Sequence, residues 1–263
     1  MTRSRAWGLA GAALGAASAL VAFAPAAWLA GWVARASEER LLLADARGTV
    51  WQGDAQVVLG GGPGSRDARV LPGRLQWRVR WLGRELALQA RQACCLNEAF
   101  ELRLQPGIGR LSVQVMPVQG ALMQWPAGWL AGLGAPWNTL ELGGTVRVTS
   151  PGLRVEHVQG RMVFGGSAEL QIDGLSSRMS LLPALGSYQL SLQAQDEAAG
   201  VASLRLSTRQ GPLMLSGQGQ LGGGQALRFR GQAHAEASSR EALNNLLNII
   251  GRRQGAVSIL SIG

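Results

Sequence analysis

The stretch Leu75-Gln76-Trp77-Arg78-Val79-Arg80-Trp81 alternates strictly between apolar and polar side chains. Successive side chains of a β-strand point to opposite faces, so this period of two places the apolar residues on one face and the polar residues on the other. The pattern predicts a strand in a sheet that is buried on one face only. Similar alternation predicts about a dozen strands in total, the others covering residues 49–59, 86–90, 102–104, 111–115, 145–149, 153–158, 161–164, 168–172, 188–194, 202–207, 213–220 and 227–235.

Gly, Pro and polar residues separate these segments, as in chains that turn back repeatedly between neighbouring strands. The sequence therefore predicts a mainly β fold with a mostly antiparallel sheet. Periodicity does not distinguish a curved sheet from a sandwich, because both bury one face of each strand.

Two segments depart from the period of two and predict helices. Residues 124–134 place Pro126 where a helix begins and Gly134 where it stops, which predicts a short central helix. Near the C-terminus, Ser238 and Glu241 have the spacing of a capping box, and Gly251 provides a stop. Between them, apolar residues with helical spacing predict an amphipathic helix that packs on an open end of the sheet: Leu243, Leu246, Leu247 and Ile250. Residues 256–262 are expected to return to the sheet.

Residues 6–34 contain no charged side chain. As a helix they would extend about 43 Å, more than the ~30 Å hydrocarbon core of a bilayer, and they predict a single transmembrane anchor. Arg3 and Arg5 precede this segment, so residues 1–5 are expected in the cytoplasm and residues 35–263 in the periplasm as a β-rich domain. Residues 38–43 are expected to continue the helix. The alternative is a signal peptide cleaved near residues 22–24, which would also export the remaining chain.

Composition bounds the remaining possibilities. The chain has a formal net charge of +9, all its basic residues are Arg, and the longest basic run is Arg252-Arg253. Nucleic acid is therefore not an expected partner, since an exported domain without basic blocks has little opportunity to meet it. Residues 37–263 are sufficient for one all-β domain.

The sequence predicts no catalytic, cofactor-binding or metal-binding residues. His157 and His234 are far apart in sequence, no serine lies in a Gly-x-Ser-x-Gly motif, and Cys-x-x-Cys is absent. Adjacent Cys94 and Cys95 leave three states open: a vicinal disulfide, a bond to another chain, or two small structural residues. Strand tryptophans are expected to anchor the core: Trp51, Trp77 and Trp81.

Several segments resemble protein N of the type II secretion system, a single-pass inner-membrane protein family of Gram-negative bacteria. The resemblance covers nearly the whole chain and rests on turn and helix-end motifs: Gly48-Thr49-Val50-Trp51-Gln52-Gly53, Leu71-Pro72-Gly73-Arg74-Leu75-Gln76-Trp77, Gly134-Ala135-Pro136-Trp137-Asn138-Thr139-Leu140, Gly186-Ser187-Tyr188, Gly211-Pro212-Leu213-Met214-Leu215-Ser216-Gly217 and Leu246-Leu247-Asn248-Ile249-Ile250-Gly251-Arg252-Arg253.

This resemblance implies an accessory role in protein secretion, with the inner-membrane platform proteins of the secretion system as partners and no active site or cofactor. A second hypothesis is a periplasmic groove that binds or transfers phospholipid along the apolar face of the sheet. A third, an exported hydrolase, would require a convergent serine or histidine site, which the sequence does not indicate.

Overall fold

The protein folds around one large antiparallel sheet. The computed structural model describes residues 2–98, 100–196, 200–222 and 225–262. Within these ranges, sixteen strands form one sheet in the order β1-β2-β4-β5-β6-β7-β9-β10-β11-β12-β13-β14-β16-β15, with β3 paired to β2 and β8 paired to β9. The predicted mainly β, antiparallel fold is confirmed. The sandwich alternative is wrong, because the described strands do not divide between two sheets.

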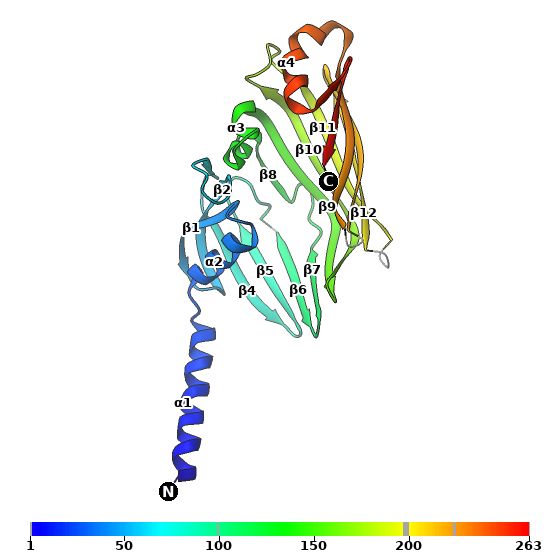
Figure 1. Cartoon of the computed structure of the whole chain (residues 1–263). Coiled ribbons are helices and arrows are strands. Elements are labelled where there is room, and N and C mark those ends of the chain that lie inside the picture. Colours follow the sequence, from blue (N-terminus) through cyan, green and yellow to red (C-terminus); the bar gives the residue numbers. More distant parts are fainter. Residues whose placement is uncertain (1, 99, 197–199, 223–224, 263) are drawn as a thin grey trace.

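The sheet follows the chain from one end of the molecule to the other (Figure 1). The first half contains β1 (Leu41–Gly48), β2 (Gln52–Gly60), β3 (Ala68–Val70), β4 (Leu75–Leu82), β5 (Glu85–Arg91), β6 (Glu101–Gly107), β7 (Arg110–Val115) and β8 (Met123–Pro126). The second half contains β9 (Leu142–Val158), β10 (Arg161–Ser177), β11 (Gly186–Asp196), β12 (Val201–Gln210), β13 (Leu213–Gly222), β14 (Gln225–Ala235), β15 (Arg252–Gln254) and β16 (Val257–Ile262).

The long strands β9 and β10 join segments that the sequence predicts as separate strands. The turn-like residues Ser150-Pro151-Gly152 interrupt the alternation, yet they form a bulge and not a break. The Ser150 hydroxyl donates a hydrogen bond to the Ser167 carbonyl at 2.6 Å and accepts one from the Gly152 amide at 3.1 Å. These bonds satisfy the polar groups that the bulge removes from the ladder, so pairing continues on both sides.

The segment predicted as one helix over residues 6–34 is divided into α1 (Thr2–Ala22) and α2 (Ala26–Ala36). Pro25 separates them because it has no N–H to continue the helical hydrogen bonds. Helix α2 packs on the sheet through Ala26 and Leu29, against Ala55 and Trp77. Within the described residues, no helix has both the length and the apolar character needed to cross a membrane.

The prediction that residues 38–43 continue the helix is wrong. Glu38 and Glu39 adopt positive φ angles of 52° and 59°, which reverse the chain after α2. Strand β1 then begins at Leu41 and pairs with β2. The apolar run of residues 41–43 suits a strand as well as a helix, and only its pairing partner decides between them.

The predicted central helix consists of two short elements. Residues Ala127–Leu133 form a 3₁₀ helix, η1, and Trp137–Leu140 form a short α-helix, α3. Pro126 directly precedes η1, and Gly134 ends it with a φ of 78°, so the predicted stop is confirmed. The internal glycines explain why this segment does not form a longer α-helix.

The amphipathic C-terminal helix is confirmed as α4 (Arg240–Ile250), and Gly251 follows it. Leu243, Leu246 and Leu247 are buried against the second half of the sheet. The predicted capping box is wrong: a 3₁₀ turn, η2 (Ala237–Ser239), precedes the helix, and its N-cap, Ser239, makes no side-chain capping bond. Strand β16 confirms the predicted return of residues 256–262 to the sheet.

Two family-like segments meet around Tyr188. Its side chain is 1% exposed, and its hydroxyl lies 3.1 Å from the Leu185 carbonyl oxygen and 2.9 Å from that of Leu213. A Cβ on Gly211 would lie 2.2 Å from the Cα of Gly186, so the two loops approach as closely as they do only because both residues are glycine. These motifs therefore have a structural role at the end of β11 and β13.

The cysteine question is decided by the structure, which joins Cys94 and Cys95 in a vicinal disulfide. Of the three predicted tryptophan anchors, Trp77 is buried, with 5% of its surface exposed, and Trp51 is partly buried. The prediction for Trp81 is wrong, since 59% of its surface is exposed. Trp81 lies at the far end of β4, outside the buried clusters in which Trp77 and Val79 pack with α2.

Candidate association surfaces

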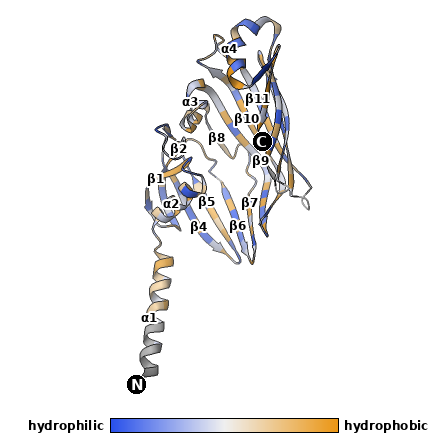
Figure 2. Cartoon of the chain, viewed as in Figure 1, coloured by the Kyte–Doolittle hydropathy of each residue, from blue (hydrophilic) through white to orange (hydrophobic). Residues whose placement is uncertain are grey.

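The two faces of the sheet differ sharply in polarity, as the alternating colours along β4 to β7 show (Figure 2). Strand pairing aligns apolar side chains with apolar ones across the strands. The clearest example is one row that crosses six strands: Trp81, Leu86, Leu104, Val113, Val155 and Phe164. We call this set the apolar row.

The apolar row lacks the cover that neighbouring residues receive. The next row on the same face lies further from the hairpin turns. There Val79 and Leu88 pack with α2, and Leu102 and Val115 pack with the cluster around Phe100. The apolar row contributes to none of the described buried clusters. Trp81 at one end is exposed, the four central members are half-buried, and Phe164 at the other end is buried, with 6% of its surface exposed. It is therefore an apolar strip partly open to solvent.

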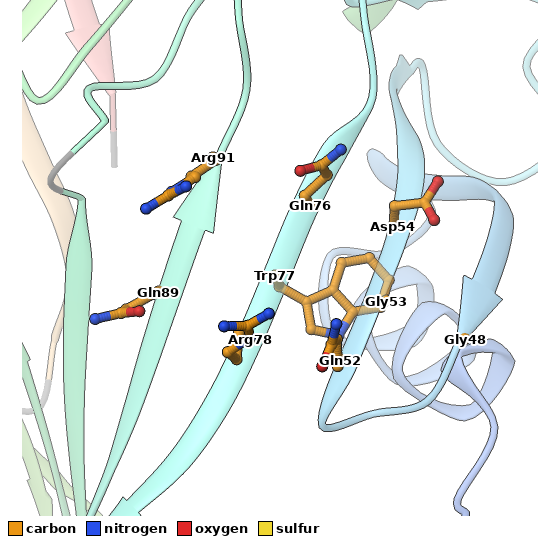
Figure 3. A pocket seen from close by; sticks show the side chains of 9 residues that line it. All are labelled: Gly48, Gln52, Gly53, Asp54, Gln76, Trp77, Arg78, Gln89 and Arg91. Carbon is orange, nitrogen blue, oxygen red and sulfur yellow. The ribbon is translucent and has the colours of Figure 1, made fainter.

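The opposite face carries a polar hollow of about 440 Å³ over β2, β4 and β5 (Figure 3). Two cross-strand rows supply its polar side chains. Gln52, Arg78 and Gln89 form one row, and Asp54, Gln76 and Arg91 form the other. The hollow is rimmed by Gly48, Gly53 and Trp77.

The sequence folds this way locally because Gly53 admits the Trp77 indole. A Cβ at Gly53 would lie 2.6 Å from that ring and 2.4 Å from the Arg47 carbonyl oxygen. The indole N–H lies within hydrogen-bonding distance of the carbonyl oxygens of Thr49 and Val50, at 3.2 and 3.1 Å. The resemblance segment of residues 48–53 thus forms a tight turn closed by one tryptophan.

Charged residues beside the hollow pair with its lining carboxylate, Asp54, and with each other. Arg74 bonds to the carboxylate of Asp54 and donates a 2.9 Å hydrogen bond to the carboxylate of Asp45. Arg47 also contacts Asp45, at 2.7 Å. Hydrogen bonds from Arg47 and then from Arg74 lower the pKa of Asp45, and the bond to Asp54 raises the pKa of Arg74.

The side chains that line the polar hollow include several hydrogen-bond donors. Among the described residues, the guanidinium groups of Arg78 and Arg91 make no ion pair, whereas Gln89 donates a 3.1 Å hydrogen bond to Glu101. This bond, followed by one from Arg103, lowers the pKa of Glu101. Amide and guanidinium groups in this hollow can donate hydrogen bonds to a partner surface.

The candidate catalytic side chains remain apart. His157 lies exposed near the end of β9, and His234 lies half-buried on β14, next to the exposed Gln232. The described part of the chain contains no cluster of three or more His, Cys, Asp or Glu residues suited to a metal. The two cysteines are bonded to each other and cannot act as thiolate ligands.

Neither the apolar row nor the polar hollow is predicted as a set by the sequence. Alternation identifies the polarity of each residue along its own strand, but it does not give the register between strands. The spacing of hairpin turns is the available signal, because short turns fix the register of adjacent strands. It would have aligned Trp81 with Leu86 across the turn at Gly83, but not with Val155.

The fold defines a class: a mainly β protein built on one large antiparallel sheet. The comparison with protein families specifies it further. The family model of type II secretion system (T2SS) protein N matches residues 39–259, and the chain belongs to this family. It is thus a component of the type II secretion machinery. Searches of curated proteins and of solved structures returned no match.

Proposed function

We propose that the protein is an accessory component of the type II secretion system that works by protein–protein association in the periplasm. Of the uncharged residues 6–34, those in α1 hold it at the inner membrane, because α2 packs on the sheet, with residues 1–5 in the cytoplasm and the sheet outside. The family match over residues 39–259 carries this proposal. The uncharged segment behind Arg3 and Arg5 and the projection of α1 from the body support the placement (Figure 1).

The polar hollow is the proposed contact surface for the inner-membrane platform proteins. Arg78 and Arg91, which make no ion pair among the described residues, and the glutamine side chains can donate hydrogen bonds to backbone carbonyls or carboxylates of a partner. The ion pairs of Arg74 with Asp45 and Asp54 lie beside the hollow and restrict the Asp54 side chain that lines it.

Site-specific photocrosslinking in cells tests the proposal. A photoreactive residue replacing Gln89 in the hollow is expected to crosslink to platform proteins that copurify from detergent-solubilised inner membrane. The matched control is the same residue at Gln210, an exposed glutamine at the end of β12, which should give no such product. A chain recovered without secretion components under mild crosslinking would contradict the proposal.

A topology assay tests the placement separately. A reporter that is active only in the periplasm, fused to the C-terminus, is expected to be active, and a reporter that is active only in the cytoplasm should be silent there. The opposite pattern would refute the proposed orientation without bearing on family membership.

The apolar row favours a second function, binding of a phospholipid acyl chain. Six aligned strands at about 4.8 Å spacing give a strip about 24 Å wide, comparable with an extended acyl chain. Mass spectrometry of the full chain, purified in a lipid-free detergent, is expected to detect bound phospholipid. Val113→Glu, which places a charge in the row, should abolish it, whereas Gln114→Glu on the opposite face should not. A lipid-free wild-type protein would exclude this function.

A further inference from the structure

Apolar side chains gather on three hairpin turns at one end of the sheet. The turns join β4 to β5, β6 to β7 and β9 to β10, and antiparallel pairing places all three at the same end. Ile108 is fully exposed at 107%, and Trp81 and Leu82 are 59% and 49% exposed. Leu111 and Met162 beside them are also exposed. We call residues 81–84, 107–111 and 158–162 the hairpin-tip surface.

Isolated exposed apolar residues are common on proteins, but a group on adjacent turns marks an interaction surface. The opposite end of the sheet also exposes apolar side chains, Leu181 at 91% and Met179 at 39%, but both belong to one connection, between β10 and β11. The hairpin-tip surface therefore requires an occupant that accepts apolar side chains from three separate turns at once.

The same surface is basic. Arg80, Arg84, Arg110 and Arg161 are exposed at this end of the sheet, and the acidic residues described there include Glu85, Glu156 and Asp196 at the end of β11. Glu156 is buried and pairs with Arg110 at 3.1 Å. Arg84 and Arg110 also line a hollow of about 260 Å³ between two of the turns. Arg84 makes no ion pair with the described residues, so an occupant with negative charge and oxygen acceptors would satisfy its guanidinium group, and it would add a second partner to Arg110.

Helix α1 leaves the molecule from this end. The turn between β1 and β2 lies at the same end of the sheet as the three hairpin turns, and it holds the last residues of α1. The Val50 amide donates a 2.9 Å hydrogen bond to the Ala24 carbonyl, and the Trp51 indole donates one of 2.7 Å to the Val21 carbonyl. From there α1 extends past the ends of β4 to β7 (Figure 1).

We infer that the hairpin-tip surface docks on the surface of an anionic lipid bilayer. Trp81, Leu82 and Ile108 enter the interfacial layer, where aromatic and aliphatic side chains are favourable, and Arg84 and Arg110 contact lipid phosphates. A bilayer fits better than a protein groove because the apolar residues lie on separate turns facing one way, alongside an exposed apolar helix. This inference does not depend on the secretion partners.

An environment-sensitive fluorophore tests the docking in the full chain. Because Cys94 and Cys95 are bonded to each other, Ile108→Cys introduces one reactive thiol under non-reducing conditions. The labelled protein is placed in nanodiscs of phosphatidylcholine with phosphatidylglycerol. We expect a blue-shifted emission that brominated lipids quench. The matched control, Leu181→Cys at the opposite end, should report water and remain unquenched.

Charge variants distinguish direct contact between the hairpin-tip surface and anionic lipid from mere proximity to the bilayer. Arg84→Glu, in the Ile108→Cys background, removes one attraction and adds one repulsion. At ~1 kcal/mol per charge near an anionic surface, the docked-to-undocked ratio should fall by about 30-fold. Arg66→Glu, an exposed site at the other end of the sheet, should change nothing.

Two results would overturn the inference. One is a probe at residue 108 that reports water in anionic nanodiscs, or that responds no differently from the probe at residue 181. The other is a response that appears only when secretion proteins are added, which would identify a protein occupant. Circular dichroism of the labelled variants confirms that the sheet is intact, as expected for substitutions at exposed turns.

Discussion

Truncation of Leu246 to alanine tests whether α4 is a packed cover for the second half of the sheet. Leu246 is 2% exposed and lies in the cluster that includes Leu213 and Tyr188. The substitution removes three carbon atoms, worth about 2.4 kcal/mol in transfer free energy at ~0.8 kcal/mol each. The cavity left behind adds to this cost, so we expect a loss of about 3 kcal/mol in the free energy of unfolding.

The assay is urea unfolding of the full chain in a mild detergent, followed by the circular dichroism of the sheet. With a denaturant slope of about 2 kcal/mol per molar, Leu246→Ala should lower the midpoint by about 1.5 M. The matched control is Ile249→Ala on the outer face of the same helix, where the side chain is 43% exposed. Its midpoint should fall by less than about 0.5 M. Equal shifts for the two variants would refute the packing of α4 on the sheet.

Three further predictions concern single groups. Tyr188→Phe should cost about 1–2 kcal/mol of unfolding free energy in the same assay, because it removes a buried hydrogen bond to a carbonyl; an unchanged midpoint would show that this bond contributes nothing. Asp45 has a lowered pKa in the folded chain, so its contribution to stability is present above its unfolded pKa of about 3.9 and is lost as pH falls through the folded value. Asp45→Asn should therefore flatten the acid limb of a stability–pH profile, and a limb as steep as that of the wild type would contradict the pairing with Arg47 and Arg74. Reduction of the Cys94–Cys95 bond should leave the melting temperature nearly unchanged, because a bond between adjacent residues closes almost no loop; a large drop measured by calorimetry would contradict this expectation.

The sequence predicts strands correctly where apolar and polar residues alternate strictly. The secondary-structure prediction is wrong where the pattern suits both a helix and a strand. Residues 75–81 lie within β4 as predicted, and α4 buries the predicted stripe. Residues 41–43 were predicted as helix, yet they form a strand because β2 provides a pairing partner. The Ser150–Gly152 bulge was predicted as a break, since a local pattern does not show whether hydrogen bonds resume beyond it.

The candidate surfaces are harder to predict from the sequence than the strands. Trp81 satisfies every local rule for a core residue, yet the cover that buries Trp77 does not extend to it. The polar hollow depends on the pairing of β2 with β4, which lie on either side of β3 in the chain. Such pairings join residues that are distant in sequence, so the periodicity within one strand does not predict them.

The amino-acid sequence by itself determined the polarity of each strand face, the amphipathic C-terminal helix and the uncharged N-terminal segment. These properties depend on neighbours within a few residues, where covalent geometry fixes the direction of each side chain. The tertiary structure alone decided that the strands form one open sheet, that the apolar row crosses six strands, and that three hairpin turns share one end with α1. These features depend on register and on which surfaces receive a cover, and both result from contacts over the whole chain.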